Sequence, residues 1–176
     1  MAVRQIRVLG DEILTKKCKP VKEVNARILE LIDDMFETMY DSSGVGLAAS
    51  QVGVLKQIVV MDVGPREDSK GEGGAATGPN GRTQTAVVLI NPEILEQDGT
   101  DTAMEGCLSV PGKSGQVTRF ASVKVRAYDT EMKPFEIDAT GLLARCIQHE
   151  CDHLNGRMYV ELVEGDLVDN ETEAQE

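Results

Sequence analysis

The chain has 176 residues, which is enough for one domain with a core of its own. Hydrophobic residues make up 41% of the sequence and aromatic residues only 3%, with no Trp, so the expected core is aliphatic. Thirty acidic residues against 18 basic ones give a net charge of −12, which argues against a general affinity for nucleic acid or anionic membranes.

The first ten residues contain no apolar signal segment, and no run of residues approaches the length of a membrane span. The four cysteines show no compact disulfide spacing and are expected to be reduced thiols, one or more of them available to a metal: Cys18, Cys107, Cys146 and Cys151. These features predict a soluble protein of the cytoplasm.

The first predicted element is a helix over residues 28–40, where apolar side chains recur at helical spacing. Asn25 is placed to cap its N-terminus, and the helix is expected to end at 41–44. Its opposite face carries three acidic residues: Asp33, Asp34 and Glu37.

Two β-branched runs, 57–63 and 86–90, predict buried strands. Between them, 64–85 contains six glycines and two prolines without any period, which predicts a mobile surface loop. Residues 122–129 alternate between apolar and polar, as a half-buried antiparallel strand does. Because helices and strands do not alternate strictly, the fold class expected is α+β.

The last predicted helix begins near Thr140, a capping residue, and ends at Asn155-Gly156. A broad stripe of this helix is expected to be buried, and it comprises Leu142, Leu143, Cys146, Ile147, His153 and Leu154.

The only two histidines of the chain, His149 and His153, lie on this helix. A spacing of four residues puts both imidazoles on one face, where they can converge on a single ion. Glu150 lies one position after the first histidine, close enough to act on a metal-bound water, and the resulting H-E-x-x-H pattern is typical of metal-dependent hydrolases. The alternative is a solvated helix face with two surface histidines, which the buried stripe makes less plausible.

A catalytic metal needs a third protein ligand, and two residues are candidates. Glu173 lies in the acidic segment 165–176, which has too few apolar residues to fix a ligand. Cys107 lies in a short apolar segment beside Gly106 and close to Pro111, and thiolate is a strong metal ligand. A lone cysteine is often an inert core thiol, but the histidine pair favours Cys107 as the third ligand.

Three segments together resemble the motifs of bacterial peptide deformylases, in the same order and at similar spacing: GVGLAASQ at 44–51, EGCLSVP at 105–111 and QHECDHLNG at 148–156. The helix at 28–40 and the run at 89–94 also resemble that family, so the similarity spans about 3–163. It implies small antiparallel sheets packed around a central metal-binding helix. Two departures are Ser50, where the family usually has proline, and the long insert 64–85.

The resemblance implies an enzyme that hydrolyses the formyl group from the N-terminal formyl-methionine of newly synthesised proteins and releases formate. Cys107, His149 and His153 would hold a divalent metal with water in the fourth position, and Glu150 would transfer protons.

By the same resemblance, the Gln51 side-chain amide and the Leu108 backbone N–H would donate hydrogen bonds to the formyl oxygen as it becomes negative. Gly46 would leave room for an extended peptide. Arg145 lies one turn before the first histidine, either at the cleft mouth near a substrate carbonyl or as a solvated side chain.

Ligand softness alone suggests zinc, whereas the resemblance implies ferrous iron, with zinc, nickel or cobalt able to substitute. The expected partners are N-formyl-methionyl nascent polypeptides, without direct nucleic-acid or membrane binding, and the expected state is a monomer. The domain predicted is a single catalytic unit over 1–163, followed by an acidic, disordered tail over 164–176.

Two other functions remain open from the residues alone. A general zinc peptidase would use Glu173 as its third ligand and cut internal peptide bonds. A non-catalytic metal-binding module would close the fourth position with a second thiol, for which Cys151 is the nearest candidate, although it points away from the histidine face.

Overall fold

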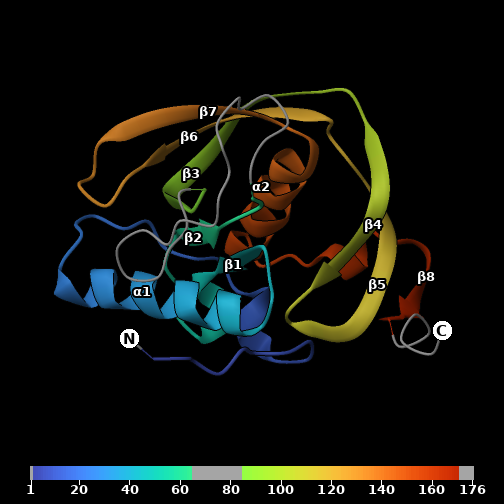
Figure 1. Cartoon of the computed structure of the whole chain (residues 1–176), viewed down its shortest axis with the longest axis horizontal. Helices are drawn as coiled ribbons and strands as arrows, with labels where there is room; N and C mark the ends of the chain where they lie inside the picture. The colour runs from blue at the N-terminus through green and yellow to red at the C-terminus, as the bar shows by residue number, and fades with distance from the viewer. Residues whose placement is uncertain (1, 65–84, 171–176) are drawn as a thin grey trace.

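The computed structural model describes residues 2–64 and 85–170. Within them, two α-helices and two antiparallel sheets confirm the predicted α+β class (Figure 1). Neither helix has the length and apolar character that crossing a membrane would require. The predictions made for most of the insert 64–85 and for 171–176 lie outside the described residues.

The larger sheet has five strands in the order β1-β2-β3-β6-β7, and every neighbouring pair is antiparallel. The strands are β1 (Gly46–Ala48), β2 (Ile58–Met61), β3 (Val87–Asp98), β6 (Ser122–Tyr128) and β7 (Pro134–Thr140). The smaller sheet has three strands in the order β4-β5-β8, namely β4 (Asp101–Cys107), β5 (Val110–Arg119) and β8 (Glu164–Asp169). The described residues also form short 3-10 helices, η1 (Glu12–Thr15), η2 (Ala49–Val52) and η4 (Tyr159–Glu161).

Strand β2 is buried on both faces, which explains its unbroken run of apolar residues. Val59 and Met61 face the core shared with helix α2 (Gly141–Leu154), whereas Ile58 and Val60 face the core shared with helix α1 (Ala26–Asp41). The two helices therefore cover opposite faces of the larger sheet at this strand.

Helix α1 begins as predicted, because the Asn25 side chain accepts a hydrogen bond from the backbone N–H of Ile28 at 3.0 Å. Of the acidic residues predicted on the face opposite the apolar one, Asp34 is buried. Its carboxylate accepts hydrogen bonds from the backbone N–H of Ala2 at 2.7 Å and from Arg4 Nε at 2.9 Å. Asp34 therefore ties the N-terminal segment to the helix.

Helix α2 lies between the larger sheet and the strands β4 and β5 (Figure 1). Its predicted buried stripe is confirmed except at Leu142, which is 53% exposed because it lies in the first turn, at the rim of a cavity described below. Thr140 occupies the capping position without a side-chain cap bond, and Gly156 adopts the expected left-handed conformation after the helix, with φ of +75°.

Strand β8 corrects the prediction of a disordered tail that starts at residue 164. It pairs with the edge of β5. The side chain of Leu167 on β8 packs, together with Val163, against a third apolar cluster, which consists of Leu14, Val110, Val117, Met158 and Tyr159. Thr118 on β5 also donates a hydrogen bond to Glu164 at 2.6 Å. Backbone pairing with an open strand edge orders this segment although it is acidic and poor in apolar residues. The fold therefore continues past the boundary expected at residue 163.

Candidate metal centre

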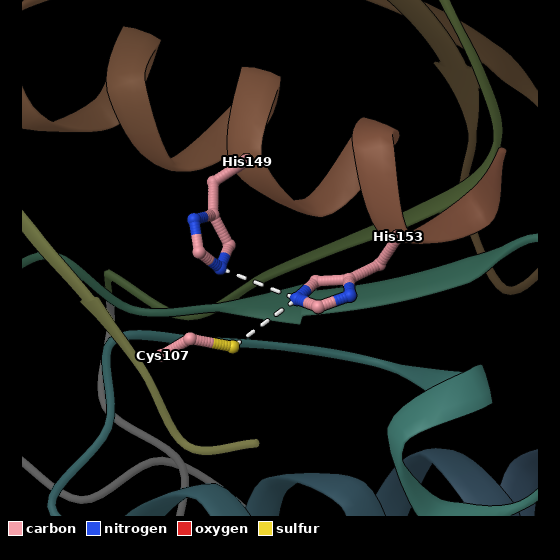
Figure 2. A group of neighbouring side chains, drawn as sticks. All are labelled: Cys107, His149 and His153. Carbon is pink, nitrogen blue, oxygen red and sulfur yellow. Dashed lines mark hydrogen bonds between the residues drawn. The ribbon is translucent and has the colours of Figure 1, made fainter. Parts of the chain in front are cut away.

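Helix α2 and the β4–β5 hairpin bring Cys107, His149 and His153 together (Figure 2). The Nε2 atoms of the two histidines are 3.2 Å apart, and Cys107 Sγ lies 3.3 Å from His153 Nε2. One ligand atom from each residue falls within 4.8 Å of the others. The histidine pair and the thiol favoured from sequence therefore converge on one point.

Glu105, two residues before the thiol on β4, fixes the orientation of the first histidine. Its Oε1 lies 2.5 Å from His149 Nδ1, so Nδ1 carries the proton and Nε2 is left for a metal. Arg119 donates to both oxygens of Glu105, at 2.8 Å and 3.1 Å. Burial by itself would raise the pKa of Glu105, but the hydrogen bonds from His149 and Arg119 outweigh it and lower this pKa to about 2.

Arg145 completes the support behind Glu105 and is not a solvated side chain, since it is only 6% exposed. Its guanidinium donates to Glu105 Oε2 at 3.2 Å, to the Val117 carbonyl at 3.0 Å and to the Asp101 carbonyl at 2.8 Å. The role of Glu105 was not predicted, although the residue stands within the EGCLSVP motif. The partners of Arg145 could not be predicted either, because Arg145 lies on helix α2 and its partners lie on strands β4 and β5 of the smaller sheet.

Glu150 is buried beside the ligands, and its Oε2 has no hydrogen-bond partner among the described residues. Burial raises the pKa of Glu150 to about 7. Gly46 makes room for this carboxylate, because a Cβ at that position would lie only 2.7 Å from Glu150 Oε1 and 2.6 Å from Cys146 Sγ. A buried carboxyl group with a pKa near neutrality can both accept and release a proton.

Gln51 lies on the 3-10 helix η2, and its side chain reaches the thiol of Cys107. Ser50, the preceding residue of η2, is also buried. Gln51 Oε1 accepts a hydrogen bond from the Ala48 backbone N–H at 2.9 Å. Its Nε2 donates to Ser109 Oγ at 3.0 Å and lies 3.5 Å from Cys107 Sγ. Gln51 therefore presents its amide nitrogen, and not its oxygen, to the ligand cluster.

A cavity of about 600 Å³ opens onto these groups. Six of the seven predicted site residues line it, and they are Gly46, Gln51, Cys107, Leu108, His149 and Glu150. His153 lies outside this lining and is 1% exposed. Leu108, in the turn between β4 and β5, and the exposed Leu142 give the cavity apolar walls. A cavity of this size with apolar walls and a few polar groups is typical of a small-molecule or peptide binding site.

The donor set fits a divalent cation. Burial by itself would lower the pKa of His149, yet the neighbouring Cys107 and Glu105 raise it to about 10, so the site stabilises positive charge at this position. Burial and the charge of His149 lower the pKa of His153 to about 3, which leaves a neutral imidazole able to bind a metal.

Neither Cys151 as an additional fourth ligand nor Glu173 as an alternative third ligand gains support from the described residues. Cys151 is outside the ligand cluster and packs against the apolar core, where burial raises the pKa of its thiol to about 12. Glu173 lies outside the described residues. Among those described, Cys107, His149 and His153 form the single group of three or more His, Cys, Asp or Glu side chains able to hold a metal.

Comparison with known proteins agrees with this geometry. The polypeptide deformylase family model matches residues 3–166. A peptide deformylase of Agathobacter rectalis is 55% identical over 169 residues, 96% of this chain and 95% of the relative. One of Lachnoclostridium phytofermentans is 53% identical over 95% of this chain and 93% of the relative.

Solved structures show the same fold. The crystal structure of a peptide deformylase from Legionella pneumophila has a TM-score of 0.81 at 43% identity, covering 93% of this chain and 87% of that one. The crystal structure of the Thermotoga maritima peptide deformylase has a TM-score of 0.81 at 38% identity, covering 94% of this chain and 100% of that chain. The chain therefore belongs to the peptide deformylase family, metal-dependent hydrolases that remove the N-terminal formyl group from newly made proteins.

Proposed function

We propose that Cys107, His149 and His153 hold the catalytic metal of this deformylase and that the metal is ferrous iron. The convergence of one thiolate and two imidazole nitrogens, with Glu105 holding one of the imidazoles, carries this proposal. Thiolate and imidazole ligands also suit zinc, nickel and cobalt, which are expected to substitute. Iron itself rests on the resemblance of the three motifs to the family.

A metal held by these residues would supply Lewis acidity, which lowers the pKa of water so that hydroxide becomes available as the nucleophile near neutral pH. Glu150 is the group placed to accept the proton of that water, since its Oε2 is buried without a partner among the described residues. With a pKa of about 7, the same carboxyl group then delivers the proton to the departing amine.

Gln51 and Leu108 are the proposed donors to the formyl oxygen as negative charge develops on it. The Gln51 amide nitrogen lies beside the thiol, and its oxygen is fixed by the Ala48 N–H, so the donor end cannot turn away. Leu108 places its backbone N–H in the turn that follows Cys107. Losing one such donor typically reduces the rate by about 100- to 1,000-fold.

In this proposal Gly46 has two roles: it leaves room for the Glu150 carboxylate, and it leaves room for the substrate. It lies on β1, the edge strand of the larger sheet, and lines the cavity, so an extended formyl-methionyl peptide can approach its backbone. We further propose that the enzyme acts as a monomer in the cytoplasm, where newly synthesised chains carry the formyl group.

Formate release from a formyl-methionyl tripeptide tests the ligand assignment. Iron-loaded protein prepared without oxygen is expected to release formate, and Cys107→Ala is expected to lose both bound metal and activity. Cys151→Ala is the matched control, because it removes a thiol from helix α2 that lies outside the ligand cluster. Activity and metal content that survive Cys107→Ala would favour a different third ligand and the general peptidase.

A further inference from the structure

Tyr159 is the bulkiest fully buried side chain among the described residues, and neither the metal ligation nor the proton transfer involves it. It lies on η4, the 3-10 helix that follows α2 in the chain. Its ring packs against the first histidine ligand, with 5.8 Å between the ring centroids of Tyr159 and His149 and 31° between the ring planes. Glu105 holds His149 at its Nδ1 atom, so Tyr159 is a second group that limits how this imidazole can turn.

The hydroxyl of Tyr159 reaches the hairpin that carries the thiol ligand. It donates a hydrogen bond to the backbone carbonyl of Lys113, at 3.5 Å between the two oxygens. Lys113 lies on β5, the strand that pairs with β4, and Cys107 is the last residue of β4. A single side chain therefore contacts one ligand with its ring and the hairpin of another ligand with its hydroxyl.

The C-terminal strand packs against the same group of side chains. Tyr159 belongs to the third apolar cluster, and both Cys107 and Leu167 pack against that cluster. Cys107 comes from the end of β4, whereas Leu167 comes from β8, which lies beside β5 (Figure 1). Because protein interiors are close-packed, a change at Leu167 is transmitted to its neighbours as strain or as a cavity. Two metal ligands and the C-terminal strand are therefore connected by one small cluster.

Leu167 is the main side-chain attachment of β8. It is the only β8 residue that is not exposed. The ion pair of Asp169 with Lys113 and the hydrogen bond of Glu164 with Thr118 join exposed side chains, and such contacts contribute little to stability. Apart from backbone pairing with β5, the strand is therefore held by one leucine that packs against the third apolar cluster.

We propose that Tyr159 is a positioning residue for His149 and that, through Leu167, the order of strand β8 sets the affinity of the metal centre. The proposal rests on the ligand set Cys107, His149 and His153. Groups that orient a metal ligand typically change the metal affinity by about 10- to 100-fold, because a ligand that is free to move is no longer preorganised. The acidic strand near the C-terminus thus has a functional task, although its sequence is poor in apolar residues.

Thermodynamic linkage makes this coupling reciprocal. If an ordered β8 strengthens metal binding by some factor, bound metal must favour the ordered strand by the same factor. Metal binding is therefore expected to suppress the local opening of β8, which amide hydrogen exchange detects. A purely structural role of Tyr159 and Leu167 would stabilise the fold equally with and without metal.

The zinc affinity of the full-length protein, measured by competition with a chelator, tests the first half of the proposal. Tyr159→Leu is expected to bind zinc about 10-fold more weakly, whereas Tyr159→Phe keeps the ring and is expected to stay within about threefold. Leu167→Ala is expected to bind about threefold more weakly, and Val168→Ala, at the exposed neighbouring position, is expected to bind normally. Visible absorption of the cobalt-loaded protein reports ligand geometry, so its bands should change in Tyr159→Leu and be preserved in Tyr159→Phe.

Amide hydrogen exchange of the unmodified protein tests the second half and requires no variant. Saturating zinc is expected to slow the exchange of the β8 amides by at least about fivefold. The matched control is β7, the edge strand of the larger sheet, whose apolar side chains pack in another cluster and whose amides should respond little. The effect of zinc on β8 should vanish in Cys107→Ala.

The outcomes separate this proposal from the ligand assignment. An unmodified protein that binds no zinc would refute both. If zinc binds, but Tyr159→Leu and Leu167→Ala bind it as tightly as Val168→Ala, the ligands stand and Tyr159 has only a structural role. If zinc slows exchange equally in β7 and β8, or in neither, β8 is not coupled to the metal. Each of these last two results overturns the proposal and leaves the ligand assignment intact.

Discussion

At the scale of single residues, two buried carboxylates beside the ligands have opposite pKa shifts. Glu105 is held by Arg119 and His149, which lower its pKa to about 2, so it stays ionised and fixes a ligand. Glu150 is buried without such partners, and its pKa rises to about 7. Because their environments shift the two carboxyl pKa values in opposite directions, the two residues have different roles: Glu105 stays ionised and supports a ligand, and Glu150 can exchange a proton.

Glu150→Gln is expected to retain metal while formate release falls by at least about 100-fold, because the amide keeps the shape but cannot take a proton. Metal analysis of the purified variant and a formate assay measure the two effects. Glu136→Gln, a change at an exposed carboxylate, should alter neither. Equal loss of metal and activity would make Glu150 a structural residue.

Glu105→Gln is expected to weaken metal binding by about 10- to 100-fold, because His149 loses the carboxylate that orients it. It should also lower the free energy of unfolding of the metal-free protein by up to about 3 kcal/mol, since Arg119 and Arg145 would lose their shared buried charge partner and keep only Asp152 and Asp101. Competition with a chelator and urea unfolding measure these two quantities. If Glu105→Gln behaves like Glu164→Gln, a change at an exposed carboxylate, the proposed support of His149 is absent.

At the scale of elements, the sequence predicted those with a strong local pattern. Helix α1, strand β2 and helix α2 were all anticipated, because periodic or continuous apolar runs mark faces that are buried. Strands β4 and β5 were not, since their residues are rich in Gly and polar side chains and are ordered by pairing with each other. Strand β8 depends on a partner about 50 residues away, which no local pattern reveals.

The packing of β8 can be tested within the strand itself. Leu167→Ala is expected to lower the free energy of unfolding by about 1 to 2 kcal/mol, because Leu167 packs against the third apolar cluster. Val168→Ala, at the neighbouring and 49% exposed position, should have little effect. Urea unfolding of both variants gives the comparison. If both variants leave the free energy of unfolding unchanged, residues 164–169 do not pack on the fold and belong to the disordered tail expected from the sequence.

At the scale of the whole molecule, the site is assembled from both sheets and the helix between them. The histidine pair could be predicted because its spacing lies within one helix, and the thiol because a pair needs a third ligand. The salt bridges of Arg119 and Arg145 with Glu105 could not. Arg119 pairs across the β4–β5 hairpin, which has no strong local pattern, and Arg145 joins helix α2 to strand β4, 40 residues away. Metal, helix and both sheets are thereby coupled to one another.

This coupling predicts that the described fold unfolds in one cooperative urea transition and that bound zinc moves the transition to higher urea. Far-ultraviolet circular dichroism and tyrosine fluorescence follow it, since the chain has no Trp. The shift caused by zinc should vanish in Cys107→Ala. Two separate transitions would show that the smaller sheet folds independently of α2.

The ligand set itself is tested most directly by X-ray absorption spectroscopy of the zinc-loaded protein, on a sample that also releases formate. We expect one sulfur at about 2.3 Å and two imidazole nitrogens at about 2.0 to 2.1 Å, with a light atom from solvent completing the shell. Two sulfurs would mean that Cys151 closes the site, and no sulfur would remove Cys107 as a ligand; either result would contradict the account.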